Sequence, residues 1–249
     1  MKTSVITVCR NSASTIEDAI RSVASQTYPD IEHIVVDGAS TDGTLDLLER
    51  YRDRLAKVIS EPDRGIYDAM NKGVDFATGE IICFLNSDDV YADNAVISKV
   101  VDRLRRDNLD VVYGDVAFFK DETPAIMLRR YRSNRFRPDR IGWGWMPAHP
   151  ALFVRRHMFD QYGGFRADYR IAGDFEFVAR IFRRDTLRHC YLPEVLVRMR
   201  LRGISTGGWR NTLLLNKEVL RACRENGIPT NIFKILSKYP VKMLEYLQT

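Results

Sequence analysis

Polar and acidic residues stand at the ends of four apolar runs in this 249-residue chain. In chain order they are Arg10 and Asn11, then Asp37, then Asp63, and then Asp88 and Asp89. Carboxylate oxygens are the ligands that hard divalent cations take in proteins, so the Asp88 and Asp89 pair predicts a cation site. A cation there could bridge the acidic rim to a diphosphate, which suits a nucleotide ligand.

Glycine-rich phosphate loops, which hold nucleotides without an acidic rim, do not occur in the sequence. The first glycine is Gly38, so no G-x-G-x-x-G follows the first apolar run, and no G-x-x-x-x-G-K-[ST] is present. Bare NAD or ATP phosphate sites need such a turn leading into a helix N-terminus, so the sequence argues against both.

The elements that must position these residues alternate between buried strands and amphipathic helices. Strands are predicted over 4–9, 33–37, 58–60 and 81–85, and helices over about 14–24, 45–51 and 66–77. Further along, the pattern predicts a helix over 92–106 and strands over 111–119 and 151–154. Alternating strands and helices imply an α/β fold with a parallel sheet covered on both faces. Ligands bind such sheets at the carboxyl ends of the strands, where the polar residues stand.

The composition is that of an ordinary soluble globular protein, with 45% hydrophobic and 29% charged residues. Its four cysteines form no C-x-x-C pair, which argues against a zinc ribbon or a disulfide framework and suits a reducing cytosol. No apolar run reaches membrane-span length, and the start is too short for a signal peptide. We therefore expect a cytoplasmic protein.

The net charge of +5 is divided unevenly along the chain. Residues 1–102 hold 10 Lys and Arg against 18 Asp and Glu, whereas residues 103–249 hold 28 against 15. The basic part suggests an anionic partner such as nucleic acid, anionic lipid or a phosphorylated substrate. An arginine-rich surface that is merely solvated is the alternative.

Four blocks of the sequence, residues 5–11, 36–44, 63–73 and 84–89, resemble family 2 glycosyltransferases in order and spacing. A fifth block at 163–177 is similar to the acceptor half of that family. The resemblance implies a GT-A fold, which is a Rossmann-like, mostly parallel sheet with helices on both faces. It also implies a nucleoside-diphosphate sugar donor, expected to be UDP-linked, a Mn²⁺ or Mg²⁺ cofactor, and inversion at the anomeric carbon.

The resemblance also implies roles for individual residues. The nucleotide-sugar pocket would be lined by Thr7, Asn11, Asp37, Asp63, Arg64, Asn71, Ser87 and Asp88. Asp89, with Asp88 beside it, would bind the metal, and Asp174 matches the catalytic base. The sequence departs from many relatives at Asn86, where an Asp-x-Asp often begins, and at Met70, where an arginine is common.

Each of these residues has a structural alternative. Asp88, Asp89 and Asp37 could be turn residues, and Asp174 could cap the helix that follows it. His149 precedes the strand at 151–154, a position where relatives approach the diphosphate or the acceptor, but a lone histidine is often a structural hydrogen-bonding residue. Residues 203–208 could form a lid over the donor or an ordinary loop.

The resulting prediction is an inverting glycosyltransferase of polysaccharide biosynthesis that acts on a glycan or lipid-diphosphate-linked acceptor. A sugar-nucleotide nucleotidyltransferase is one alternative, although that class needs a glycine-rich basic turn after the first strand. A non-catalytic nucleic-acid-binding protein is the other, although the acidic rim and the lack of an aromatic RNA-binding motif argue against it. We therefore expect no nucleic-acid partner.

We predict one domain over residues 1–249, because no repeat or long linker divides the chain. Its parts would be a nucleotide-sugar-binding half (1–110), an acceptor half (111–205) and a helical C-terminal extension (206–249). Lys234, Lys238 and Lys242 recur at four-residue spacing, and Pro240 would break this tail into two short amphipathic pieces. Such basic pieces could bind the inner face of an anionic membrane peripherally. Packing on the core or on a second subunit is the alternative, and the oligomeric state stays open.

Overall fold

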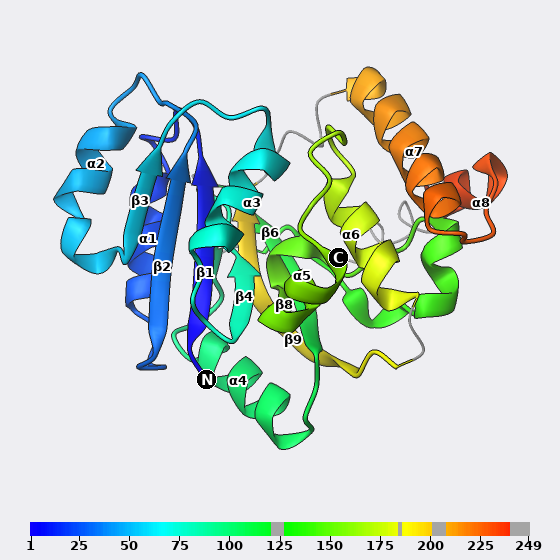
Figure 1. Cartoon of the computed structure of the whole chain (residues 1–249), viewed down its shortest axis with the longest axis horizontal. Helices are drawn as coiled ribbons and strands as arrows, with labels where there is room; N and C mark the ends of the chain where they lie inside the picture. The colour runs from blue at the N-terminus through cyan, green and yellow to red at the C-terminus, as the bar shows by residue number, and fades with distance from the viewer. Residues whose placement is uncertain (121–126, 184–185, 201–207, 240–249) are drawn as a thin grey trace.

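The structure is a computed structural model that describes residues 1–120, 127–183, 186–200 and 208–239 (Figure 1). Its strands are β1 (Thr3–Cys9), β2 (Ile31–Asp37), β3 (Lys57–Ser60), β4 (Ile81–Phe84), β5 (Asp89–Tyr91), β6 (Val111–Phe119), β7 (Arg129–Tyr131), β8 (Leu152–Arg155) and β9 (His189–Arg200). Its α-helices are α1 (Ile16–Ala24), α2 (Thr44–Arg50), α3 (Ile66–Phe76), α4 (Val96–Arg106), α5 (Arg156–Tyr162), α6 (Gly173–Phe182), α7 (Gly208–Glu225) and α8 (Ile232–Leu236). Short 3₁₀ turns include η3 (Pro138–Trp143).

Within the described residues, the strands form one mostly parallel sheet in the order β3-β2-β1-β4-β8-β6-β9-β5, with β7 paired to β6. Parallel pairing joins β3 to β2, β2 to β1, β1 to β4 and β6 to β9. The exceptions are β8, β7 and β5, each of which pairs antiparallel to its neighbours. The predicted α/β class with a mostly parallel sheet is therefore confirmed.

Helices cover both faces of the sheet, because successive side chains of a strand point to opposite faces. On one face, Ile6 and Val8 of β1 pack in a cluster with residues of α3, α5, α6 and α7. On the other face, Val5 and Cys9 pack in clusters with residues of α1, α2 and α4. Figure 1 shows α3 and α5 in front of the sheet and α1 behind it. A Cβ at Gly73 would overlap the Ile6 side chain, so glycine is what allows α3 to pack so closely on β1.

Two strands that bear on the site lie outside the sequence-based expectation. The short strand β5 begins at Asp89, where no strand was predicted, and the helix after it starts at Val96 rather than at residue 92. β5 pairs with the end of β9, which the sequence pattern did not indicate. Helices α7 and α8 lie in the predicted helical extension, and residues 240–249, including Lys242, lie outside the described residues. The division into three parts stays a prediction.

Among the described residues, the longest helices do not combine the length and apolar character needed to cross a bilayer.

A buried histidine joins the first two strands of the sheet. His33 on β2 is 3% exposed, and its Nε2 lies 2.9 Å from the Thr7 hydroxyl oxygen on β1. Burial lowers the pKa of His33 to about 3, because the imidazolium form would lose its hydration inside the sheet. The folded protein therefore holds this ring neutral.

We expect the free energy of unfolding to fall as the pH drops below about 6.5. In the unfolded chain His33 takes up a proton near that pH, whereas in the folded chain it does so only near its lowered pKa of about 3. The unfolded state thus binds more protons in this window, which costs about 1.4 kcal/mol of stability per pH unit. The measurement is the free energy of unfolding from urea titrations at several pH values between about 7 and 5. We expect this free energy to change less with pH for His33→Gln than for the wild type. The same change of unfolding free energy with pH in both proteins would contradict this account.

Candidate functional site

The ends of the first three strands meet at the carboxyl edge of the sheet. The Asn11 side-chain oxygen accepts a hydrogen bond of 2.8 Å from the Thr41 N–H, and the Asn11 N–H donates to the Ser40 hydroxyl at 2.7 Å. A Cβ at Gly38 would overlap the Asp63 carboxylate, so the β2 turn touches the residue that follows β3. Asn11 has a φ of 52°, a left-handed conformation that asparagine tolerates better than most residues.

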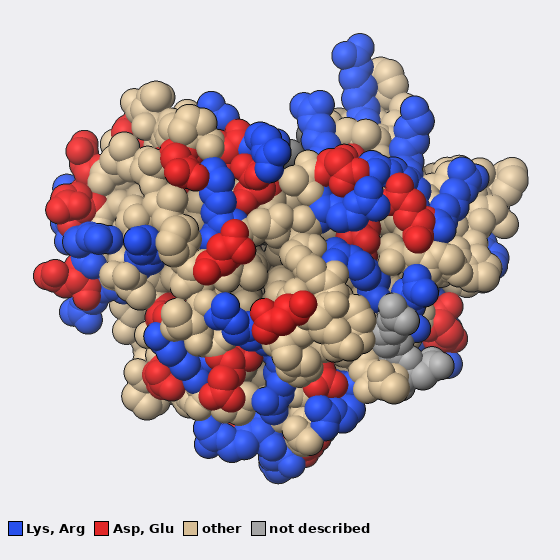
Figure 2. All heavy atoms as spheres, in the orientation of Figure 1, with Lys and Arg blue, Asp and Glu red and all other residues tan. Residues whose placement is uncertain are grey.

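The end of the fourth strand joins the same edge. The Ser87 hydroxyl lies 3.0 Å from the hydroxyl of Ser12, which follows β1. The predicted juxtaposition of four strand ends is therefore present. The molecular surface is notched at this edge, between the lobe that carries α2 and the lobe that carries α7, and side chains of both charges flank the notch (Figure 2).

Asp37 ends β2 and is fully buried. Its Oδ2 accepts hydrogen bonds from the Ser40 N–H at 3.0 Å and from the Ser60 hydroxyl at 2.7 Å, and its Oδ1 accepts one from the Ser40 hydroxyl. These bonds tie the turn after β2 to the end of β3. Asp37 therefore shapes the edge on which Asp63 lies, and its role in a nucleotide-sugar pocket stays a prediction.

Three predicted nucleotide-sugar residues make contacts within the protein. Thr7 is fully buried beside His33, two residues before the carboxyl end of β1. The exposed Arg64 side chain pairs with Asp68 at 2.7 Å. Asn71 of α3 bonds both ends of its amide to the Phe165 backbone, each at 2.7 Å, which ties the donor half to the loop before α6. Their roles toward a nucleotide sugar stay predictions.

Asp88 and Asp89 bring two carboxylates together at the start of β5. Asp89 is 1% exposed and accepts a hydrogen bond of 3.0 Å from the Asn86 amide. Burial raises the pKa of Asp89 well above its ordinary range, and the nearby Asp88 charge adds to this effect. Burial also raises the pKa of Asp88. Both charged forms are disfavoured here, so a bound cation would stabilise them.

A divalent cation fits this pair only if other ligands complete its shell. In the described part of the chain, no three His, Cys, Asp or Glu side chains are grouped to share a metal ion. Mg²⁺ commonly binds through one or two carboxylates together with substrate phosphates and water, which is the donor set available beside Asp88 and Asp89. Asn86, where an aspartate is common, is the amide that donates to Asp89.

Arg200 at the end of β9 holds the same segment in place, and the sequence reasoning missed it. One guanidinium nitrogen donates to the Asp88 carbonyl at 3.1 Å, and another pairs with Asp18 of α1 at 2.5 Å. The side chain is only 10% exposed. No local signal could have found it, because the contact depends on the pairing of β5 with β9 across more than a hundred residues. The possible lid at 203–208 lies almost wholly outside the described residues.

Asp174 lies in the first turn of α6 and contacts the donor half. Its Oδ1 accepts hydrogen bonds from the Phe175 N–H at 2.8 Å and from the Tyr67 hydroxyl at 3.2 Å. The helix starts at Gly173 with Ala172 at the N-cap position, so Asp174 is not the N-cap residue, although its carboxylate accepts one N–H of the first turn. Tyr67 was known from the sequence only as part of the third block, and its contact with Asp174 spans 107 positions.

His149 connects the end of β4 with the region of Asp174. Its ring is 9% exposed, stacks on Phe84 at 5.4 Å between centroids, and meets the Phe165 ring edge-on at 5.7 Å. Burial lowers the pKa of His149, and the charge of Asp174 acts in the opposite direction. The ring packs as a structural residue would, and a role toward the diphosphate or acceptor stays a prediction.

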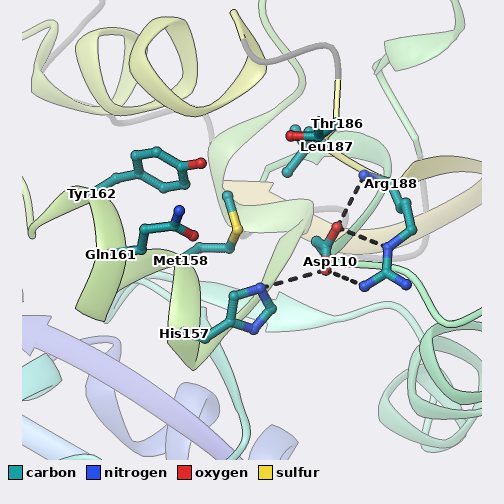
Figure 3. Close-up of a pocket in the computed structure, with 8 residues that line it drawn as sticks. All are labelled: Asp110, His157, Met158, Gln161, Tyr162, Thr186, Leu187 and Arg188. Atoms are coloured by element: carbon teal, nitrogen blue, oxygen red, sulfur yellow. Dashed lines mark hydrogen bonds and ion pairs between the residues drawn. The ribbon is translucent and has the colours of Figure 1, made fainter.

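A hollow of about 280 Å³ lies at the opposite edge of the sheet. It is lined by Asp110, His157, Met158, Gln161, Tyr162, Thr186, Leu187 and Arg188 (Figure 3). Asp110 and Arg188 precede the parallel strands β6 and β9, so this hollow is at their amino ends. The Arg188 guanidinium and the His157 ring both point at the Asp110 carboxylate, at 2.8 and 3.4 Å. These three side chains therefore contact one another, and the hollow is separate from the site.

Comparison with known proteins identifies the class. The family model described as glycosyl transferase family 2 matches residues 4–190. A "PGL/p-HBAD biosynthesis glycosyltransferase" of Mycobacterium bovis (strain BCG / Pasteur 1173P2) is 32% identical over 228 residues, which are 88% of this chain and 82% of that protein. The chain therefore belongs to glycosyl transferase family 2. The nucleotidyltransferase and nucleic-acid-binding alternatives are set aside by this membership.

Solved structures of low sequence identity share the fold. Staphylococcus aureus TarS 1–349 superposes with a TM-score of 0.68 at 20% identity, over 89% of this chain and 65% of the TarS chain. The mannosyltransferase PcManGT from Pyrobaculum calidifontis, solved with GDP-Man and Mn²⁺, gives a TM-score of 0.65 at 23% identity, over 88% of this chain and 64% of that one. The predicted GT-A fold is confirmed, and the chain spans about two thirds of these solved chains.

We expect Asp89→Ala to abolish the dependence of UDP binding on Mn²⁺, because the variant removes the more deeply buried carboxylate of the pair. Calorimetric titration of UDP with and without Mn²⁺ measures this dependence. Asp93→Ala is the matched control, since Asp93 lies just past β5 with a half-exposed side chain paired to Lys99. A variant at Asp89 with unchanged metal-dependent affinity would remove that residue from the cation site.

Proposed function

We propose that the protein is an inverting glycosyltransferase that moves a sugar from a UDP-sugar to a glycan or lipid-diphosphate-linked acceptor in polysaccharide biosynthesis. The observation that carries the proposal is the arrangement of Asp88 and Asp89 at the carboxyl edge, joined through Phe84 and His149 to the region of Asp174. One side of the site thus offers a cation-binding pair, and the other offers a candidate base.

Ligands of the structural neighbours support a nucleotide-sugar donor. TarS has been solved with UDP and with UDP-GlcNAc, and PcManGT with GDP-Man. In the proposed complex, the nucleotide lies along the strand ends near Asn11, Asp37 and Asp63. Ser87 and Asp88 then face the ribose or the sugar.

Transfer requires a nucleophilic acceptor oxygen on the face of the sugar opposite the leaving diphosphate. The Asp174 carboxylate removes the proton of the acceptor hydroxyl as its oxygen bonds to the anomeric carbon. The bond from that carbon to the diphosphate oxygen breaks, its electron pair leaves with the nucleoside diphosphate, and the configuration inverts. A Mn²⁺ or Mg²⁺ ion held by Asp89 and Asp88 would offset the negative charge that develops on the diphosphate.

A lipid-linked acceptor would place the site at a membrane surface, and one exposed patch suits that location. The α8 surface is defined here as Arg137, Arg140, Trp143, Ile232, Phe233, Lys234 and Leu236. Phe233 is 80% exposed and Trp143 is 42% exposed, while Lys234 Nζ lies 5.5 Å from the Trp143 ring centroid. Basic and aromatic side chains together favour an anionic bilayer interface. Lys and Arg side chains also gather over neighbouring α7 (Figure 2).

The structure corrects one part of the expectation that Lys234, Lys238 and Lys242 form a basic surface. Lys238 is 4% exposed, so it does not share the surface of Lys234 as its spacing suggested. A Cβ at Gly144 would lie 3.1 Å from its Nζ, which shows how closely the Lys238 side chain packs under that turn. The proposed membrane contact therefore depends on the α8 surface and on the exposed arginines beside it.

We expect Asp174→Asn to lower the transfer rate by about 10²-fold or more, because the amide cannot accept the acceptor proton. Donor affinity should stay near the wild-type value, since the change alters no residue of the strand-end edge. The measurement is kcat with a competent acceptor, alongside calorimetric donor binding. Asp168→Asn is the control, because Asp168 is half-exposed and pairs with Arg166 and Arg221 on the surface. Wild-type turnover in the Asp174 variant would exclude this base.

We expect the intact protein to co-sediment with vesicles that contain anionic lipid and to be released by salt. Phe233→Asp should lose most of this binding, because it places a carboxylate in the middle of the α8 surface. Leu45→Asp is the matched control, since Leu45 is a 40% exposed apolar residue on α2. Equal losses in the two variants, or no sedimentation of the wild type at low salt, would overturn the membrane proposal.

A further inference from the structure

Helix α7 carries a buried carboxylate that faces the loop before the proposed base. Glu218 is 8% exposed, and α7 packs against α6. The family model ends at residue 190, so its match assigns no role to this helix. Asp174, by contrast, lies inside the matched segment.

The Glu218 carboxylate accepts three hydrogen bonds from consecutive backbone N–H groups. Its Oε1 accepts from Arg170, and its Oε2 accepts from Ile171 and Ala172, each at 2.8 Å. These residues directly precede Gly173 and Asp174 in the first turn of α6. An ionised carboxylate is an acceptor only, so it matches three converging donors without conflict.

Tyr67 holds the same loop from the donor half. Its hydroxyl lies 2.6 Å from the Ile171 carbonyl oxygen and 3.2 Å from the Asp174 carboxylate. A Cβ at Gly173 would lie 2.7 Å from a ring carbon of Tyr67, so the backbone is pressed onto the ring. The peptide groups around Ile171 are thus bonded on the N–H side by Glu218 and on the carbonyl side by Tyr67.

We infer that Glu218 is a positioning residue for Asp174, which makes the C-terminal helix α7 part of the machinery for acceptor activation. The inference rests on the proposed function, because it assumes Asp174 to be the base. A base must lie within hydrogen-bond reach of the proton it removes, and a misplacement of about 1 Å can cost about 10²-fold in rate. Three bonds to the residues just before α6 limit such a displacement.

The test is Glu218→Gln, which keeps the size of the side chain but replaces one acceptor oxygen with an NH₂ group that faces an N–H donor. We expect kcat to fall by about 10-fold or more while donor affinity stays within about twofold of the wild type. The control is Glu225→Gln on the same helix, since Glu225 pairs with Arg166 and Arg221 instead of with the loop backbone. The control should retain wild-type kcat.

A double variant separates positioning from a general structural effect. If Glu218 acts through Asp174, then adding Glu218→Gln to Asp174→Asn should lower the residual rate no further. Additive losses, or equal losses in the Glu225 control, would overturn the inference. If Glu218→Gln does not fold, Glu218→Asp takes its place in the same cycle, because it keeps the carboxylate but shortens the side chain that reaches the three N–H groups.

The two proposals fail in different ways. Wild-type turnover in Asp174→Asn refutes the assigned base and with it any action of Glu218 through that base. A large loss in Asp174→Asn together with unchanged kcat in Glu218→Gln refutes the positioning role alone.

Discussion

Each carboxylate that this fold buries loses its hydration, and hydrogen bonds or a cation must replace the lost water. Asp37 and Glu218 meet this requirement with N–H and O–H donors of the protein, and in doing so they determine the path of the turn after β2 and of the loop before α6. Asp89 is buried as deeply, yet its pKa is held well above the ordinary range. The protein's own donors do not offset its desolvation, which is the physical reason for proposing that a cation binds beside this carboxylate.

The two sides of the site are joined by contacts between distant segments. Phe84 at the end of β4 stacks on His149, and His149 meets Phe165 edge-on. Asn71 of α3 bonds the Phe165 backbone at both ends of its amide, with Gly164 packed against the same group. These contacts hold the segments around His149 and Phe165 against β4 and α3, so aromatic packing and hydrogen bonds to the backbone set the position of the loop before α6 relative to the strand-end edge.

Local periodicity was enough to predict β1 to β4, because buried parallel strands are apolar runs and the helices between them carry one apolar face. It also placed Asp37 and Asp63 at strand ends. It could not indicate β9 or the pairing of β9 with β5, since the strand is only partly buried and its partner is short and distant. For the same reason Arg200 and Glu218 were missed. Both residues bond to backbone groups far away in the chain. Almost every residue has the same backbone N–H and carbonyl groups, so the sequence does not indicate which of them a side chain will contact.

The region of Asp174 and the pair at Asp88 and Asp89 differ in whether the protein alone stabilises their carboxylates. The loop before Asp174 is bonded on both sides by Glu218 and Tyr67, so the candidate base is positioned by the protein alone. The pair at Asp88 and Asp89 is held in place by Arg200 and Asn86 but remains electrostatically unfavourable, because Asp89 is buried away from water and the charge of the partly buried Asp88 lies nearby. The arrangement that would bind a cation at β5 is therefore one that costs the free protein stability, which is a conflict between stability and binding. A cation that arrives with a diphosphate would relieve that conflict, and the repulsion that weakens the free pair would then become selectivity for a metal-bound donor.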